Sequence, residues 1–64
     1  MYDNRMRDIR KKQGMMLKEL AQKTGITIGY LCHLEKGTRK NPSVETMSKI
    51  ANALGKDVKE VFFS

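Results

Sequence analysis

Cys32 and His33 are neighbouring residues of this 64-residue chain whose side chains could together perform catalysis or bind a metal. A cysteine beside a histidine suggests a nucleophile with its base, or two zinc ligands. Successive residues of a helix point about 100° apart, however, so these two side chains do not face each other. The chain holds no other cysteine or histidine that could complete a zinc shell. We therefore expect no enzyme, no metal centre, no cofactor and no small-molecule ligand.

The same segment predicts an unusual helix surface. The stretch TGITIGYLCHLEKGTRK, residues 24–40, reads as a helix from Ile28 to Lys36 between two glycine turns. With Leu31 at the centre of the buried side, the helical period turns a mixed set of residues outward. The residues on or beside this face are Ile28, Gly29, Tyr30, Cys32, His33 and Lys36. A glycine permits close approach, apolar groups and an imidazole suit base edges, and cations suit phosphates.

The charge of the chain favours a polyanionic partner. The net charge is +6, and residues 1–40 carry ten Lys or Arg against four Asp or Glu. Residues 41–64 carry three of each kind and are neutral overall. A basic half of this kind is typical of a surface for nucleic acid. No apolar run approaches the roughly 18 residues of a membrane span, and the charged start is unlike a signal peptide. We expect no membrane contact and a cytoplasmic location.

Hydrophobic periodicity and helix caps predict an all-α fold of five helices in a single domain, residues 1–64. The predicted helices run from about Asn4 to Gln13, from Leu17 to Thr24, from Ile28 to Lys36, from Ser43 as cap through Leu54, and onward from Asp57 as cap. Thr27 and Ser43 are expected to cap the third and fourth helices. The residues predicted to face the core from the last two helices are Val44, Met47, Ile50, Ala51, Leu54, Val58, Val61 and Phe62.

The segment LKELAQKTGITIGYLCHLEKGTRKNPSVETMSKIANALG resembles the Cro/CI-type helix-turn-helix family of small phage and bacterial repressors. It is similar to the pattern LxxLAxxxGITxxYLxxLExG, followed by a basic loop and NPSxxTxxxIAxALG. The resemblance extends from about Arg5 to Phe62. It implies a compact five-helix domain, with the helix-turn-helix in the second and third helices. It also implies binding to double-stranded DNA, usually as a dimer, to regulate transcription, with repression as the expected sign.

The resemblance assigns roles to individual positions. The third helix matches the family's recognition helix, which places four residues at base edges: Ile28, Gly29, Cys32 and His33. The positions matching phosphate contacts are Leu17, Lys18, Thr27, Tyr30, Lys36, Thr38, Arg39 and Lys40. For Tyr30, packing against the second helix remains an equal alternative to a phosphate contact through its hydroxyl. Cys32 is expected to be a small packing residue at the DNA surface.

Two further features follow from the resemblance. Arg10 and Glu35 match a family pair that joins the first helix to the end of the third, although charge alone would make Arg10 a DNA contact. Met16 stands where the family usually has Ser or Thr, so the second helix is predicted to lack a side-chain cap. Leu17 stands where the family often has Gln, so only its backbone amide is left to meet a phosphate.

A recognition helix reads about four base edges, so we expect a weak homodimer that assembles on DNA. The expected dimer interface contains Val58, Phe62 and Phe63 at the C-terminal end. A protein-interaction module, such as the antitoxin of a toxin–antitoxin pair, is the alternative function on the same fold. The basic loop and the capped third helix favour DNA binding over this alternative.

Overall fold

The chain folds into five α-helices. A computed structural model describes residues 4–39 and 41–63, and within these residues there is no strand. The helices are α1 (Met6–Lys12), α2 (Leu17–Thr24), α3 (Ile28–Lys36), α4 (Val44–Leu54) and α5 (Val58–Phe62). The predicted bounds of α2 and α3 are confirmed, and α1 is shorter than predicted at both ends. Lys40, one of the expected phosphate contacts, lies outside the described residues.

Local sequence determines where α3 begins and ends. The Thr27 hydroxyl oxygen accepts a hydrogen bond from the Tyr30 amide at 3.3 Å, which confirms the predicted cap. At the other end Gly37 has φ 80°, a left-handed conformation that other residues adopt only at an energetic cost. Gly25 has φ 73° and turns the chain sharply between α2 and α3. The recognition helix of the predicted motif is thus defined by its cap and by the two glycine turns.

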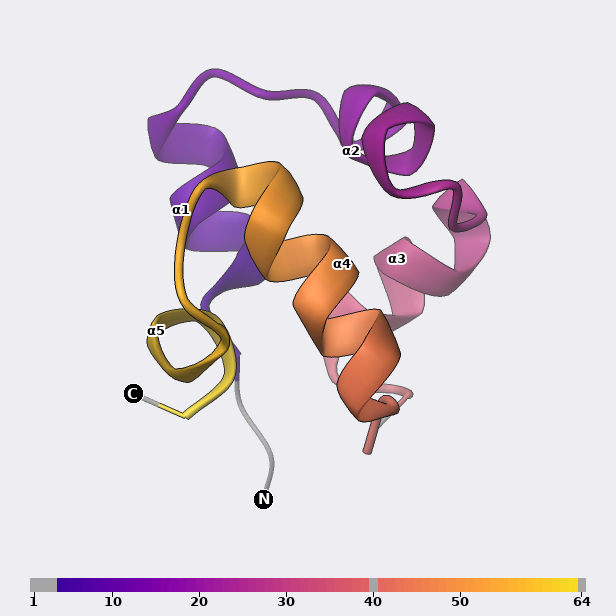
Figure 1. The fold of residues 1–64 in the computed structure, drawn as a ribbon. Coiled ribbons are helices and arrows are strands. Elements are labelled where there is room, and N and C mark those ends of the chain that lie inside the picture. The colour runs from indigo at the N-terminus through magenta and orange to yellow at the C-terminus, as the bar shows by residue number, and fades with distance from the viewer. Residues whose placement is uncertain (1–3, 40, 64) are drawn as a thin grey trace.

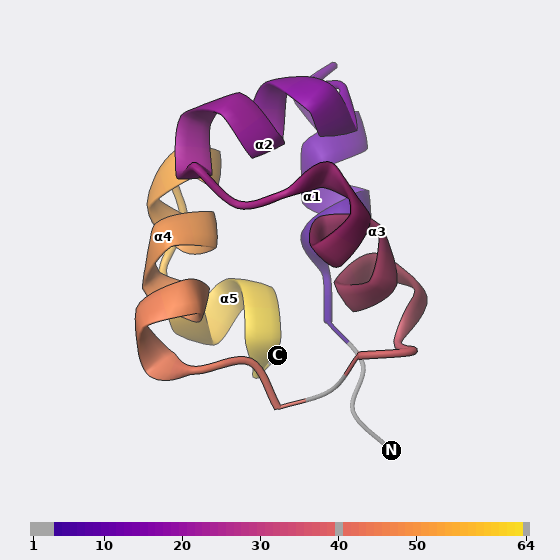
Figure 2. The same cartoon turned by 90° about the vertical axis from the view of Figure 1, so that its right-hand side faces the viewer.

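Helix α4 occupies the middle of the fold. It contacts α1, α2 and α5, and α2 also contacts α3. In Figure 1, α1 and α5 lie on one side of α4, and α2 and α3 lie on the other. Figure 2 shows α2 above the end of α4, with its short connection to α3 running across the front. The buried core between the helices consists of Met6, Ile9, Leu20, Leu31, Leu34, Ile50, Ala51, Leu54, Val61 and Phe62.

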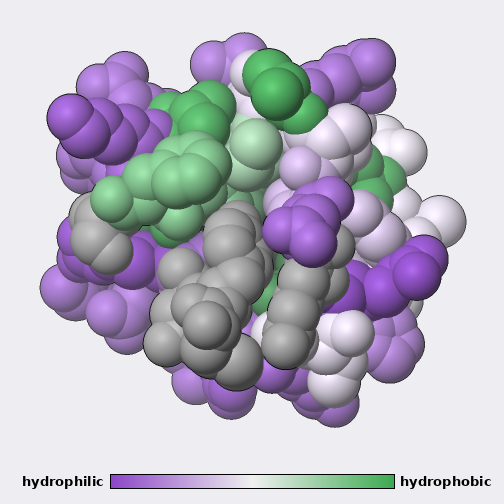
Figure 3. Space-filling view, turned by 90° about the horizontal axis from the view of Figure 1, so that it is seen from below, coloured by the Kyte–Doolittle hydropathy of each residue, from purple (hydrophilic) through white to green (hydrophobic). Residues whose placement is uncertain are grey.

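Two of the expectations about the C-terminal half are wrong. Val44 was expected in the core but is 73% exposed, since it is the first residue of α4 and the buried residues of that helix begin only at Ile50. Phe62 was assigned to the core and to a dimer interface, and it is buried in the core, so it offers almost no surface to a second chain. Phe63, by contrast, is 62% exposed, so it remains available for the expected interface. The start of α4 and the end of α5 both lie at the lower side of Figure 1, and hydrophobic side chains reach the surface there (Figure 3).

Candidate nucleic-acid interface

The outward face of α3 is arranged as the helical period predicted. Leu31 and Leu34 are fully buried and fix the rotation of the helix against the core. Gly29, His33 and Lys36 are exposed, as is Ile28, while Tyr30 and Cys32 are half-buried at the two edges. The structure therefore brings the expected base-reading residues together on one side of one helix.

Gly29 has no structural reason to be glycine. Apart from its chain neighbours and the backbone of its own helix, a methyl group added there would meet nothing within 4 Å, and the residue is the second of α3, in the first turn. A glycine within a helix destabilises it by up to about 1 kcal/mol relative to alanine. The exposed backbone at this position thus carries an energetic cost that packing does not explain. Close approach of another molecule to this face is the physical use that such a gap has.

The C-terminal end of α3 is closed by a group of hydrogen bonds around His33. Its carbonyl oxygen accepts the backbone amides of Gly37, Thr38 and Arg39. Its ring Nδ1 lies 2.8 Å from the Thr38 hydroxyl oxygen, which is also 3.2 Å from the His33 carbonyl oxygen. This contact was not predicted, because it depends on the path that the chain takes after Gly37. The exposed ring of His33 is therefore held by a side chain from the following loop.

Arg39 and Tyr30 form the rim of an open depression next to this group. The Arg39 guanidinium lies 5.4 Å from the centre of the Tyr30 ring, in cation–π geometry. Thr27, His33 and Thr38 complete the lining of the depression, whose volume is about 580 Å³. Tyr30 also packs against the core, while its expected packing on α2 in particular stays a prediction. Its hydroxyl contact with a phosphate stays a prediction.

The N-terminus of α2 lacks a capping hydroxyl or carboxylate at the N-cap residue, but the side chain of Glu19 caps it instead. Met16 occupies the N-cap position and makes no side-chain cap hydrogen bond, as predicted. The Glu19 carboxylate, however, accepts a hydrogen bond from the Met16 amide at 3.0 Å. This is one half of a capping box, and an acidic residue three positions after the cap is its signal in the sequence. Leu17 packs against the core, and Lys18 is exposed beside the helix end.

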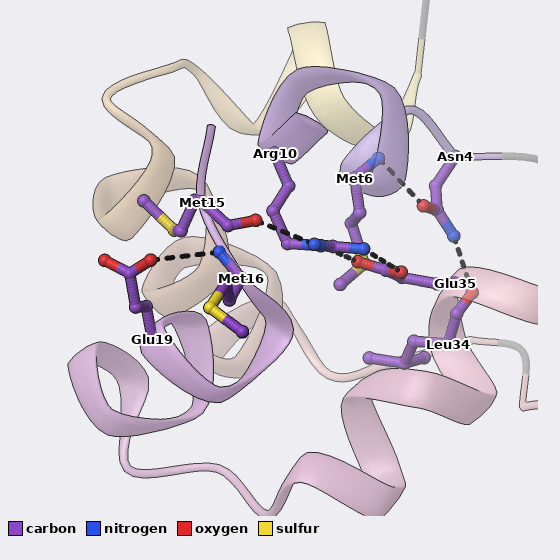
Figure 4. Close-up of polar contacts among 8 residues, drawn as sticks. All are labelled: Asn4, Met6, Arg10, Met15, Met16, Glu19, Leu34 and Glu35. Atoms are coloured by element: carbon purple, nitrogen blue, oxygen red, sulfur yellow. Dashed lines mark hydrogen bonds and ion pairs between the residues drawn. The ribbon is translucent and has the colours of Figure 1, made fainter. Parts of the chain in front are cut away.

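The pair predicted between Arg10 and Glu35 is confirmed and is nearly buried. Arg10 Nε donates to Glu35 Oε2 at 2.7 Å and Nη2 donates to Oε1 at 3.1 Å, while the side chains are 10% and 6% exposed. A third donor, Nη1, binds the Met15 carbonyl oxygen at 2.7 Å (Figure 4). The hydrogen bonds from Arg10 to Glu35 raise the arginine pKa, against the effect of burial, which lowers it.

Asn4 adds a second connection between α1 and α3. Its Nδ2 donates to the Leu34 carbonyl oxygen at 2.9 Å, and its Oδ1 accepts from the Met6 amide at 3.0 Å. Figure 4 shows that the side chains of Arg10, which is in α1, and of Asn4, which precedes α1, point to the same end of α3. Together with the Met15 carbonyl, these contacts fix α1, the start of α2 and the end of α3 relative to one another. Sequence reasoning found the ion pair and missed Asn4 and Met15.

Two other features are absent from the described part of the chain. No group of three or more His, Cys, Asp or Glu side chains there could hold a metal ion. None of the described helices has the length and apolar character needed to cross a membrane.

Comparisons with known proteins agree with this geometry. Residues 6–61 match a family described as helix-turn-helix. The chain is 41% identical over 51 residues to the HTH-type transcriptional regulator DdrOP3 of Deinococcus deserti, covering 80% of this chain and 39% of that protein. It is 35% identical over 54 residues to SinR of Bacillus subtilis, covering 84% of this chain and 49% of SinR. The chain thus spans less than half the length of these curated relatives.

A solved structure extends the comparison to the fold. The restriction-modification controller protein C.AhdI of Aeromonas hydrophila superimposes with a TM-score of 0.82 at 32% identity, covering 88% of this chain and 83% of that one. The family match spans most of the chain, and the buried Arg10–Glu35 pair and the capped α3 agree with it. The chain therefore belongs to the Cro/C1-type helix-turn-helix family.

Proposed function

We propose that this domain binds double-stranded DNA with α3 in the major groove and, as part of a transcriptional regulator, represses genes from the sites it occupies. The observation that carries the proposal is the outward face of α3. It combines an unexplained helical glycine with an imidazole and an apolar side chain, and cations flank its C-terminal end. The major groove is wide enough for a helix and displays the groups that such side chains can contact.

The base-reading role is proposed for the middle of that face. Ile28 is 49% exposed and can contact a thymine methyl group, and Gly29 allows the helix backbone to approach. His33 is the exposed polar side chain among the four expected readers. Cys32 is half-buried beside Arg7 and Lys36, so its proposed contact is at the edge of the interface.

Phosphate contacts are proposed on both sides of these readers. The Thr27 hydroxyl oxygen already accepts the Tyr30 amide, which leaves its own proton free to donate to a phosphate. The Leu17 amide at the start of α2 and the exposed cations of Lys18, Lys36 and Arg39 supply the other donors. Lys40 remains a proposed contact although it lies outside the described residues.

The relatives support a regulatory role by their names. DdrOP3 and SinR are HTH-type transcriptional regulators, and C.AhdI is a restriction-modification controller. The solved N-terminal domain of SinR, described as DNA-binding, superimposes with a TM-score of 0.79 at 35% identity, covering 84% of this chain and 78% of that one. For the present chain the corresponding activity is proposed, with the cytoplasm as its setting.

A weak homodimer on DNA completes the proposal. Phe63 is exposed at the end of α5, and Val58 is half-buried on the same helix. Val44 adds a second exposed apolar side chain. It belongs to the start of α4, which lies at the lower side of Figure 1, as does the end of α5. In the proposed dimer the two α3 helices lie in successive major grooves, which are about 34 Å apart. The patch is small, so we propose a monomer in solution that dimerises on a pseudo-palindromic site.

The test is selection of bound sites from a random DNA pool, followed by affinity measurements at several salt concentrations. The proposal predicts enrichment of a pseudo-palindrome and an affinity that falls steeply with salt, by a slope of about 0.9 for each phosphate contact. Sedimentation of the complex should show two chains per site, and Phe63→Ser should reduce the cooperativity of binding. Failure to enrich any sequence, with salt-independent or absent DNA binding, would favour the protein-interaction module instead.

A further inference from the structure

The Thr38 hydroxyl has one proton and two acceptors within reach, both on His33. The His33 carbonyl oxygen already receives the backbone amides of Gly37, Thr38 and Arg39, the last two at 3.0 and 3.2 Å. A carbonyl oxygen has two lone pairs, so a fourth donor adds little there. The ring Nδ1 is the nearer acceptor, at 2.8 Å against 3.2 Å for the carbonyl oxygen. On these grounds the hydroxyl proton of Thr38 is assigned to Nδ1 rather than to the carbonyl oxygen, the other acceptor at hydrogen-bond distance.

This contact decides which hydrogen-bonding group His33 presents. In a neutral imidazole one nitrogen donates and the other accepts, so an accepting Nδ1 leaves the proton on Nε2. In the imidazolium form Nδ1–H can donate to the Thr38 oxygen, and Nε2 again carries a proton. The exposed Nε2 edge of His33 is a donor in both states. A ring that was free to turn would offer a donor or an acceptor.

A fixed donor can discriminate among the major-groove edges. Guanine presents two neighbouring acceptors, N7 and O6, whereas cytosine presents the N4 amino donor. Adenine presents a donor beside its single N7 acceptor, and thymine presents one acceptor beside a methyl group. Guanine is thus the base that a single fixed donor satisfies with the fewest opposing groups.

We infer that Thr38 is a positioning residue for base recognition, which holds the His33 ring as an Nε2 donor and so makes this position of the site prefer guanine. The inference rests on the proposed function, because it names the base that the proposed recognition helix reads. It gives Thr38 a role different from the phosphate contact expected from the family pattern. While the ring is neutral, the Thr38 hydroxyl proton is used inside the protein and is not available to a phosphate oxygen.

Two conservative variants of Thr38 separate these roles. Thr38→Val keeps the shape and removes the hydroxyl, while Thr38→Ser keeps the hydroxyl. On the duplex selected by the unaltered protein, and on duplexes with each other base at one position, Thr38→Val should lose about fivefold of the guanine preference and Thr38→Ser should retain it. The salt slope should not change in either variant. His33→Ala should lose the same preference, and adding Thr38→Val to it should have no further effect.

The base atoms can be tested in the same assay. Replacing guanine by 7-deazaguanine at that position removes N7. The substitution should weaken binding of the unaltered protein and of Thr38→Ser but not of His33→Ala. A Thr38→Val variant that binds all sequences less well, with a salt slope reduced by about one, would show a phosphate contact and overturn the inference.

A measurement without DNA keeps the inference separate from the proposed function. Nitrogen-15 NMR of the free protein at pH about 9, where imidazole is neutral, reports which ring nitrogen carries the proton. We expect the proton on Nε2 of His33 in the unaltered chain. A proton on Nδ1 would overturn the inference even if DNA binding were intact. Absence of DNA binding, with the expected tautomer, would instead remove the proposed function and the guanine reading with it.

Discussion

The charged residues near the C-terminal end of α3 fall into a buried group, the inner end, and an exposed group, the outer end, which use the same kinds of side chain in opposite ways. At the inner end, Arg10 gives all its described hydrogen bonds to groups of the protein, namely Glu35 and the Met15 carbonyl. At the outer end, Lys36 and Arg39 are exposed, and the described partner of Arg39 is the face of the Tyr30 ring. Both ends are basic in the sequence. Burial and the presence of a carboxylate partner, rather than charge, determine which cations hold the fold and which remain for a ligand.

The largest loss of stability should come from breaking the nearly buried Arg10–Glu35 ion pair at the inner end. Glu35→Ala leaves Arg10 charged and nearly buried without its partner, which typically costs about 3–5 kcal/mol. That is a large share of the stability of a small domain, so much of the population should unfold. Thermal melts followed by circular dichroism measure the effect.

Glu45→Ala is the matched control for this variant. Glu45 lies 3.5 Å from Lys49, but its side chain is 79% exposed, so its loss should cost no more than about 0.5 kcal/mol. If Glu35→Ala instead melted like Glu45→Ala and bound DNA slightly more tightly, Glu35 would belong with the outer surface. The distinction between the two ends would then be wrong.

The outer end should respond in binding and hardly in stability. His33→Ala should cost about 1–3 kcal/mol on the best site and relax the preference at one base pair. Lys36→Ala should weaken binding to all sequences alike and reduce the salt slope by about one. Lys56→Ala, an exposed cation just before α5, is the control and should change neither quantity. Equal losses for His33→Ala on selected and random DNA would contradict its assignment to base reading.

The inner and outer ends also differ in how far the sequence predicted them. The bounds of α2 and α3 follow from hydrophobic period, caps and glycine turns, which are local signals. The Arg10–Glu35 pair was predicted from the family pattern alone. The contacts of Met15 and Asn4 were not, because both involve backbone carbonyl groups that every residue has.

The remaining errors have related causes. Val44 fits the period of α4, but a first turn can extend beyond the neighbouring helices, and period alone does not say where they end. Phe62 was assigned both to the core and to a dimer interface, and the packing of α5 buries it in the core. The His33–Thr38 contact depends on the loop path after Gly37, which neither helical angles nor residue types determine.

The start of α2 connects the buried ion pair with the proposed interface. The Met15 carbonyl oxygen accepts a hydrogen bond from Arg10, and α2 begins two residues later with amides that are proposed to bind a phosphate. Met16→Thr should add a cap there and stabilise the fold by about 0.5–1 kcal/mol. The gain is at the lower part of the range for such caps because Glu19 already binds the Met16 amide. Melting temperatures test this, and a lower value for Met16→Thr would mean that the methionine packs usefully. The salt slope of DNA binding should stay the same.

A smaller effect is expected from Glu19, in the first turn of α2. The Glu19 carboxylate lies 3.0 Å from the Met16 amide, so it places a negative charge at the helix end where a phosphate is proposed to bind. Glutamine can keep the capping hydrogen bond without that charge. Glu19→Gln should therefore tighten binding to all sequences by a few-fold at low salt, and less at high salt, where screening weakens the repulsion. Glu45→Gln makes the same change in the first turn of α4, away from the proposed interface, and should leave affinity unaltered. Equal tightening by both variants would show a general effect of net charge. Tightening by Glu19→Gln alone would place the start of α2 at the phosphate backbone, with Met15 holding the fold and the neighbouring amides holding the DNA.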